Sequence, residues 1–300
     1  MQSKSSTLRL TIISVLAVAC LIFSQIEEDR SIRKLEEKED EADEARPTMY
    51  TFFEPVNGLG DKFNDPMIEE WKYEWERIGF QTKVLTLADA EKHPYFQTMK
   101  EEVKKPFPND TYNQYCFYRY LAMAASGGGW MSDNDTFPMD FDMEEATNLP
   151  NEGKFTSFQS HVPALISASA DEWARVAQIM TESIASSTQN VKSDMYILYE
   201  IKITKQASIH DIKLMPQSYV NAPNHVYSEP HKIDCKEMEG RRAIHMSHFG
   251  LDTVYRAGKY PIAAEYPLGS KARAEGARVI MDDWREQCDS GGSKKVEAVQ

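Results

Sequence analysis

The segment that decides the fold runs from Tyr115 to Asp135 and reads YCFYRYLAMAASGGGWMSDND. Its first half is apolar on nearly every side of a helix, which predicts a helix buried in the core from Thr111 to Ser126. Arg119 is the one charged residue in that half, and a buried charge needs a partner or a ligand. The three glycines that follow allow the helix to end and the chain to turn sharply into a strand.

The predicted strand delivers two carboxylates, Asp133 and Asp135, to its far end. Alternation along an extended chain would place both on one side, with Asn134 on the other. Paired carboxylates bind hard divalent cations such as Mn²⁺ or Mg²⁺, and such a cation neutralises charge on a diphosphate leaving group. The sequence therefore predicts a metal site here, and a chance acidic turn that caps a strand is the alternative.

A second Asp-x-Asp motif, at residues 140–142, follows a few residues later. It has no buried helix and no glycine turn before it, and Pro138 lies just upstream. We interpret this second motif as part of a solvated loop. The first motif is distinguished from it by the buried helix and the glycine turn that precede the first motif.

Strand and helix patterns alternate on both sides of the deciding segment. A β-type run begins at Thr48, a helix follows from Pro66 to Ile78, and a short strand covers Lys83 to Leu87. Further along we expect a helix over 89–103, a helix over 170–186, an apolar segment over 195–203, a β-like run over 243–246 and a helix over 271–287. This order predicts an α/β layer fold, in which ligands gather at the carboxyl ends of strands.

The N-terminal part predicts an anchor and a spacer. Residues 10–26 contain no charge, follow Lys4 and Arg9, and precede an acidic run, which indicates a transmembrane signal anchor behind a cytosolic tail of residues 1–9. A cleaved signal peptide is the alternative, since residues 17–19 read Ala-Val-Ala. Either interpretation sends the rest of the chain into the secretory lumen. We expect a solvated acidic stem over 27–47, a catalytic domain over 48–288 and a disordered tail over 289–300.

Charge and cysteine content exclude some classes of protein. The formal net charge of −13 disfavours binding to nucleic acid. The four cysteines, Cys20, Cys116, Cys235 and Cys288, show no CxxC spacing, which argues against structural zinc. Because Cys20 lies in the apolar N-terminal run, the folded part holds at most one disulfide. We favour Cys235 with Cys288, against the alternative of free buried thiols.

The region of about residues 113–138 contains a helix with an arginine, a glycine turn, a strand and an Asp-x-Asp pair. It resembles the sugar-binding region of DXD-containing glycosyltransferases related to α-1,6-mannosyltransferases and bacterial capsular sugar transferases. The resemblance implies a GT-A-like fold that binds a nucleotide-sugar donor with Mn²⁺ or Mg²⁺. It further implies that Asp133 and Asp135 contact the metal, ribose or diphosphate, and that Arg119 lies near the donor.

Three downstream residues are candidates for the remaining roles. Asp194 lies at the edge of an apolar segment, where a carboxylate suits an acceptor-side base or a positioning acid; a helix N-cap is the alternative. GT-A enzymes often take a late metal ligand from the C-terminal part of the domain. By that resemblance His248 is the first choice and His245 the second, and a structural role is the alternative for each.

Together these features predict a hexosyltransferase that is anchored as a single-pass type II protein in the Golgi or ER membrane. It would transfer a sugar from a nucleotide-sugar to a glycan or glycoprotein. The resemblance favours retention of configuration, whereas a base at Asp194 would allow inversion. The rival hypotheses are an inactive carbohydrate-binding protein of the same fold and a metal-dependent hydrolase. Asn109 and Asn134 each begin an N-glycosylation sequon.

Overall fold

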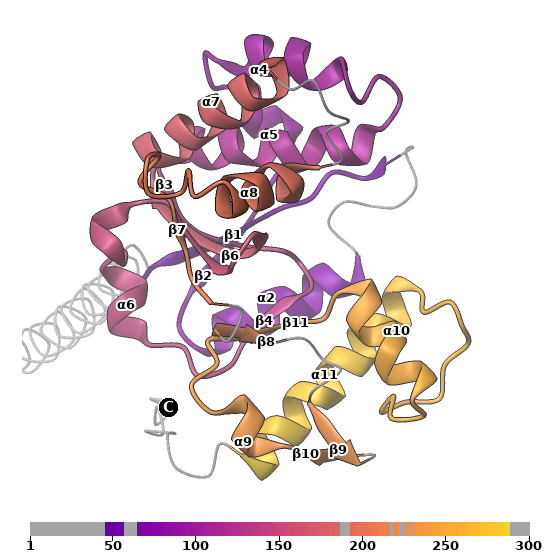
Figure 1. Cartoon of the computed structure of the whole chain (residues 1–300). Coiled ribbons are helices and arrows are strands. Elements are labelled where there is room, and N and C mark those ends of the chain that lie inside the picture. Colours follow the sequence, from indigo (N-terminus) through magenta and orange to yellow (C-terminus); the bar gives the residue numbers. More distant parts are fainter. Residues whose placement is uncertain are drawn as a thin grey trace, which may run out of the picture. The chain divides into compact units, whose positions relative to one another are not determined.

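The structure is a computed structural model that describes residues 46–56, 65–186, 193–216, 219–221, 226–229 and 231–288 (Figure 1). The chain divides into two compact units, residues 1–46 and 47–300, and every described helix and strand lies in the second. The predicted cytosolic tail, anchor and C-terminal tail, and the predicted stem up to residue 45, lie outside the described residues. No described helix is long and apolar enough to cross a membrane.

The main sheet is mixed and has the strand order β2-β1-β3-β6-β5-β7. Its strands are β1 (Thr48–Phe52), β2 (Gln81–Leu85), β3 (Gly128–Ser132), β5 (Thr156–Gln159), β6 (Val162–Ser169) and β7 (Lys213–Leu214). β1 pairs in parallel with β2 and with β3, as expected for crossover connections. β6 runs antiparallel to β3 and to β5. β5 and β6 form a hairpin, and neither of these two strands was predicted from the sequence.

Helices cover both faces of this sheet (Figure 1). One face is covered by four helices: α4 (Phe96–Lys104), α5 (Thr111–Ala125), α7 (Ala170–Ser186) and α8 (Asp194–Ile203). The other face is covered by α2 (Pro66–Arg77). The strand side chains alternate accordingly: Trp130 packs with the α2 side and Met131 with the α5 side. The predicted α/β layer fold is therefore observed.

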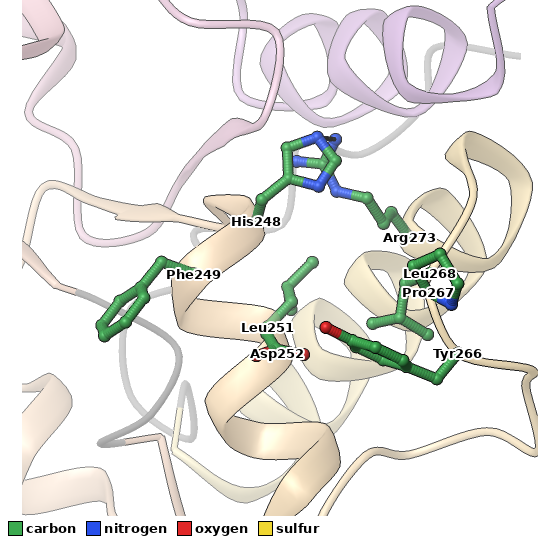
Figure 2. A pocket seen from close by; sticks show the side chains of 8 residues that line it. All are labelled: His248, Phe249, Leu251, Asp252, Tyr266, Pro267, Leu268 and Arg273. Atoms are coloured by element: carbon green, nitrogen blue, oxygen red, sulfur yellow. Dashed lines mark hydrogen bonds between the residues drawn. The ribbon is translucent and has the colours of Figure 1, made fainter.

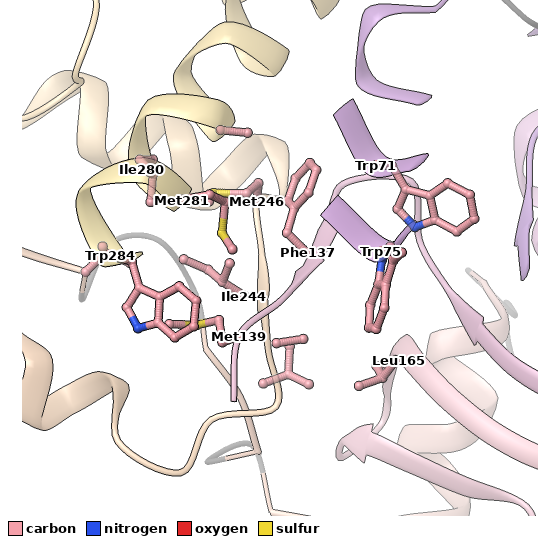
Figure 3. Packing of buried hydrophobic residues seen from close by; sticks show 14 of the residues in the cluster. Trp71, Trp75, Phe137, Met139, Leu165, Ile244, Met246, Ile280, Met281 and Trp284 are labelled. Atoms are coloured by element: carbon pink, nitrogen blue, oxygen red, sulfur yellow. The ribbon is translucent and has the colours of Figure 1, made fainter. Parts of the chain in front are cut away.

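A second, smaller sheet lies beyond α2, in the order β4-β11-β8. It consists of β4 (Thr136–Pro138), β11 (Ala243–His245) and β8 (Val220–Asn221), and α11 (Ser270–Gln287) packs near it. Figure 3 shows Trp75 of α2, Phe137 of β4, Ile244 of β11 and Met281 of α11 in one hydrophobic cluster. This cluster joins the C-terminal elements to the main sheet.

The remaining elements are α3 (Leu87–Ala90), α6 (Met143–Thr147), the 3₁₀ turn Asn151–Gly153, β9 (Tyr227–Glu229), β10 (Lys232–Ile233), α9 (Cys235–Met238) and α10 (His248–Arg256). The predicted disulfide between Cys235 and Cys288 is confirmed and ties the start of α9 to the residue after α11. Cys116 is a free thiol.

Two local predictions need correction. The strand expected over 83–87 lies two residues earlier, because Thr86 is the N-cap of α3 and its side chain and backbone both bond with Asp89. The single helix expected over 89–103 is two helices, α3 and α4, separated around Pro94. A proline has no amide hydrogen to continue the helical ladder.

Candidate metal centre

The two carboxylates lie on a tight turn. β3 ends at Ser132, and the amide of Thr136 donates to the carbonyl of Asp133 at 3.0 Å. This corrects the expectation of an extended chain: the turn, rather than alternation along a strand, brings Asp133 and Asp135 together. The side chain of Asp133 is 30% exposed and that of Asp135 is 15% exposed, so both stay accessible to a ligand.

Both ends of this turn are held by neighbouring elements. The indole of Trp71 donates to the Ser132 hydroxyl at 2.7 Å, and the indole of Trp75 donates to the Thr136 carbonyl at 3.0 Å. The amide of Met246 donates to the Asp135 carbonyl at 2.7 Å. The backbone between the two carboxylates is therefore fixed by α2 and by the segment after β11.

The glycines before β3 set the approach of the strand. Gly127, Gly128 and Gly129 have φ angles of 96°, 78° and 110°, which side chains rarely tolerate. At Gly128 a Cβ atom would lie 2.3 Å from the backbone nitrogen of Ala170. The glycine turn thus allows β3 to pass close to the start of α7 and still end at the acidic pair.

Arg119, on α5, joins Asp133 to Asp194. Its Nη1 donates to Oδ1 of Asp133 at 2.7 Å, and its Nη2 forms a short contact with Oδ2 of Asp194. The Arg119 side chain is 9% exposed, so the predicted need for a partner is met. Burial opposes the charged form, but the two carboxylates outweigh it and raise the pKa of Arg119.

Asp194 lies behind this arginine, and its side chain is only 3% exposed. It also accepts a hydrogen bond from the Tyr120 hydroxyl at 3.3 Å. The cap of α8 is Ser193, whose hydroxyl accepts from the amide of Tyr196 at 3.2 Å. A general base must reach a substrate hydroxyl, whereas this carboxylate faces Arg119. This carboxylate is thus buried against Arg119 and Tyr120.

A second arginine, Arg273 of α11, holds Asp135. Its Nη2 donates to Oδ2 of Asp135 at 2.7 Å and to the carbonyl of Met246 at 3.0 Å. Its Nη1 lies 3.0 Å from Nε2 of His248. Burial opposes ionisation of Asp135, but His245 and Arg273 outweigh that effect and lower its pKa.

His245 completes the group. Its Nε2 lies 3.4 Å from Oδ1 of Asp135, and its Nδ1 lies 2.9 Å from Oε1 of Gln159. When the neutral ring donates Nδ1–H to that amide oxygen, the lone pair of Nε2 points towards the carboxylates. Burial opposes protonation of the ring, but Asp135 outweighs it and raises the pKa of His245. A proton and a metal ion would compete for Nε2.

Asp133, Asp135 and His245 each offer one ligand atom, and these atoms all lie within 4.8 Å of one another. His248 is not part of this group. β11 ends at His245, Ser247 caps α10, and His248 is the first residue of that helix, so its ring turns to Arg273. The structure thus brings three of the four candidate metal ligands together and places the fourth beside the site.

Two residues of the site were missed in the sequence. Arg273 lies one turn before Ala277 on the apolar face of α11, and a charge on an apolar stripe is the signal that would have found it. Gln159 is a buried polar residue at the end of β5, and no local pattern marks it.

No family model and no curated protein matches this sequence. Among solved structures the chain is similar to a glycosyltransferase involved in the glycosylation of the major capsid of PBCV-1. The identity is 10%, the match covers 77% of this chain and 98% of that chain, and the TM-score is 0.38. A likeness this distant assigns neither a family nor an activity to the present chain.

Proposed function

We propose that this chain is a metal-dependent glycosyltransferase that transfers a hexose from a nucleotide-sugar to a hydroxyl of a glycan or glycoprotein. One observation carries the proposal: each of the three clustered ligands has its own orienting partner. Asp133 is held by Arg119, Asp135 by Arg273, and His245 by Gln159. Such outer contacts orient the ligands of functional metal sites.

The donor set fits a divalent cation of the Mn²⁺ type. Each arginine occupies one oxygen of its carboxylate, Oδ1 of Asp133 and Oδ2 of Asp135. Oδ2 of Asp133 and Oδ1 of Asp135 have no arginine partner and could each bind a metal. Oδ1 of Asp135 lies 3.4 Å from Nε2 of His245, which would supply the third ligand atom. Carboxylate ligands suit Mg²⁺ and Mn²⁺, whereas an imidazole ligand is more usual for transition metals. We therefore favour Mn²⁺ over Mg²⁺.

When bound, the cation would supply charge neutralisation for the nucleoside diphosphate as it leaves. Arg273 would assist, because among its described contacts only one is a carboxylate and the others are a neutral ring and a carbonyl. Arg273 therefore faces one carboxylate where Arg119 faces two, and it is the better placed of the two arginines to attract a phosphate. Arg119 would hold Asp133 in place.

The sheet supports a GT-A-like arrangement for the donor. Chain order reverses where β1 lies between β2 and β3, which makes the gap between β1 and β3 a topological switch point. Ligands of open α/β sheets bind at the carboxyl ends of strands at such a point, and Asp133 follows the end of β3 directly. Because Asp194 is buried against Arg119, the structure offers no support for a base at that position, and we keep retention of configuration as the proposed outcome.

We further propose a lumenal site in the Golgi or ER, with residues 10–26 as the membrane anchor. The Cys235–Cys288 disulfide supports an oxidising compartment. Asn109 lies exposed before α5, where a glycan would meet no obstruction, whereas Asn134 lies part-buried in the metal-site turn. Occupancy of Asn109 alone is the expected modification.

The full-length protein tests the proposal in a screen of nucleotide-sugars with Mn²⁺, with and without glycan acceptors. We expect acceptor-dependent transfer that EDTA abolishes and that Asp135→Asn lowers at least about 100-fold in kcat/KM, because a cation at a leaving group is worth several kcal/mol. Asp140→Asn, in the exposed second acidic pair, is the matched control and should leave transfer unchanged.

Other outcomes identify the rivals. Sugar release that needs no acceptor would indicate a hydrolase, and glycan binding with no turnover of any donor would indicate a carbohydrate-binding protein. Transfer that survives both EDTA and Asp135→Asn would contradict the metal mechanism.

A further inference from the structure

A cavity of about 470 Å³ lies beside the metal centre, between α10, α11 and the segment that joins them (Figure 2). Its lining residues are His248, Phe249, Leu251, Asp252, Tyr266, Pro267, Leu268 and Arg273. The volume falls in the range of about 300–1,000 Å³ that is typical of small-molecule sites.

The cavity and the metal centre share a wall. Arg273 lines the cavity, contacts Asp135 at 2.7 Å and lies 3.0 Å from Nε2 of His248, a second lining residue. Figure 2 shows these two side chains meeting at one end of the cavity. A molecule in the cavity is therefore separated from the clustered ligands by one side chain.

The chemistry of the lining suits a neutral sugar ring. Leu251 and Leu268 are buried and form an apolar surface, and Tyr266, 51% exposed, adds an aromatic ring beside them (Figure 2). The ring of Phe249 points away from the cavity, on the other side of α10. Apolar and aromatic surface packs against the C–H groups of a ring, and a carboxylate accepts hydrogen bonds from hydroxyls. Asp252 supplies such a carboxylate: its Oδ2 accepts from Arg256 at 2.8 Å, and its Oδ1 has no hydrogen-bond partner among the described residues.

The position favours the acceptor over the nucleotide. The topological switch point lies at the end of β3, on the side where Arg119 holds Asp133, whereas the cavity lies on the side where Arg273 holds Asp135. A phosphate in the cavity would face the carboxylate of Asp252, but an uncharged sugar would not be repelled.

We propose that this cavity binds the acceptor's sugar ring and places its hydroxyl towards the metal centre. The assignment of the occupant as an acceptor rests on the proposed function, whereas sugar binding in the cavity does not require turnover. Tyr266 packs against the ring, Asp252 accepts a hydroxyl hydrogen, and Arg273 separates the ring from the metal ligands.

The test measures binding directly. Saturation-transfer NMR would follow methyl glycosides of mannose, galactose and N-acetylglucosamine with the full-length protein and Mn²⁺. We expect at least one glycoside to bind and its affinity to fall about 10-fold or more in Tyr266→Ala and in Asp252→Asn, given the magnitudes of ring packing and of hydrogen bonds to charged groups. Tyr73→Ala removes an aromatic of similar exposure, 55% against 51% for Tyr266, outside the cavity and should bind normally.

The two proposals fail separately. If no glycoside binds, or if Tyr266→Ala and Asp252→Asn bind like the unaltered protein, the cavity assignment is overturned. Glycoside binding that persists in Asp135→Asn, together with its loss in Tyr266→Ala, supports the cavity whatever the outcome for catalysis. Competition of the glycoside by the nucleotide-sugar's own sugar at the same residues would assign the cavity to the donor and overturn the acceptor proposal.

Discussion

Arg119 and Arg273 occupy equivalent places on the two sides of the acidic pair, and they differ in what else they touch. Each is 8% exposed and each binds one aspartate at 2.7 Å. The second partner of Arg119 is the buried carboxylate of Asp194, whereas the other described partners of Arg273 are a histidine ring and a carbonyl. Two carboxylates therefore more than balance the charge of Arg119, whereas a single carboxylate balances that of Arg273.

The number of carboxylates around each arginine bears on whether that arginine orients a metal ligand or attracts a substrate. A guanidinium between two carboxylates has little charge left for an anion, and its removal would leave buried charge behind. A guanidinium with one carboxylate and two neutral partners still attracts phosphate. We propose a positioning role for Arg119 and a substrate-facing role for Arg273, and variants of the two residues can test this division.

The largest effect is expected on stability at Arg119. Arg119→Met would leave Asp194, whose side chain is 3% exposed, without its cation, and removal of one partner of a buried pair costs about 3–5 kcal/mol. Chemical denaturation of the full-length protein measures this loss. Arg119→Met combined with Asp194→Leu should recover most of it. A single-variant loss below about 1 kcal/mol would contradict the positioning role.

A smaller effect, on binding rather than stability, is expected at Arg273. Arg273→Met should lower Mn²⁺ affinity and kcat/KM by about 10–100-fold, the usual cost of losing a contact that orients a metal ligand. Because Asp135 is 15% exposed, water partly replaces the lost partner and stability should fall less than in Arg119→Met. Titration with Mn²⁺ and donor kinetics measure these effects.

The matched control is Arg285→Met on the same helix. Arg285 binds the buried Glu74 at 2.6 Å, away from the site, so its loss should lower stability and leave Mn²⁺ affinity unchanged. Equal losses of Mn²⁺ affinity in Arg273→Met and Arg285→Met would mean that α11 acts only as a scaffold.

The smallest effect concerns Glu70, a carboxylate that forms no hydrogen bond with an arginine among the described residues. Burial, with Glu74 nearby, raises the pKa of Glu70 to about 7, although Arg278 and Arg285 oppose the shift. The folded protein then keeps a proton that the unfolded chain releases near pH 4.5, so stability falls as the pH rises from about 4.5 to 7. Glu70→Gln should remove this slope and raise Tm above pH 7 by about 2–4 °C or less, which corresponds to about 1 kcal/mol.

Thermal denaturation across pH 4–9 checks this prediction, with Glu69→Gln on the exposed side of the same helix as control. If Tm depends on pH in the same way in the unaltered protein and in Glu70→Gln, burial does not raise the pKa of Glu70. That result would weaken the contrast between Glu70 and Asp135, whose pKa is lowered.

Local patterns predicted the parts of the fold that local chemistry decides. The helix before the glycines, the need of Arg119 for a partner and the disulfide were all predicted and are confirmed. The strands β5 and β6 were missed, because their residues are buried along nearly their whole length and show little polar alternation.

The site shows where sequence reasoning ends. The position of His245 beside the acidic pair depends on β11 pairing with β4, which no local pattern states. The choice between His245 and His248 turned on one capping residue, Ser247, which starts α10 two residues after β11 ends. Arg273 reaches Asp135 across 138 positions of sequence, a contact that only tertiary packing creates.

The indoles of Trp71 and Trp75 hold the two ends of the metal-site turn at a fixed separation. Four residues of α-helix rise about 6 Å, and the two rings donate to groups on either side of Asp133 and Asp135. Because the rise of an α-helix is nearly constant, the distance between the two indoles fixes the backbone that carries the two carboxylates. A turn held in this way needs little reorganisation when a cation binds, and the positions of the metal ligands would depend on two residues that do not contact the metal.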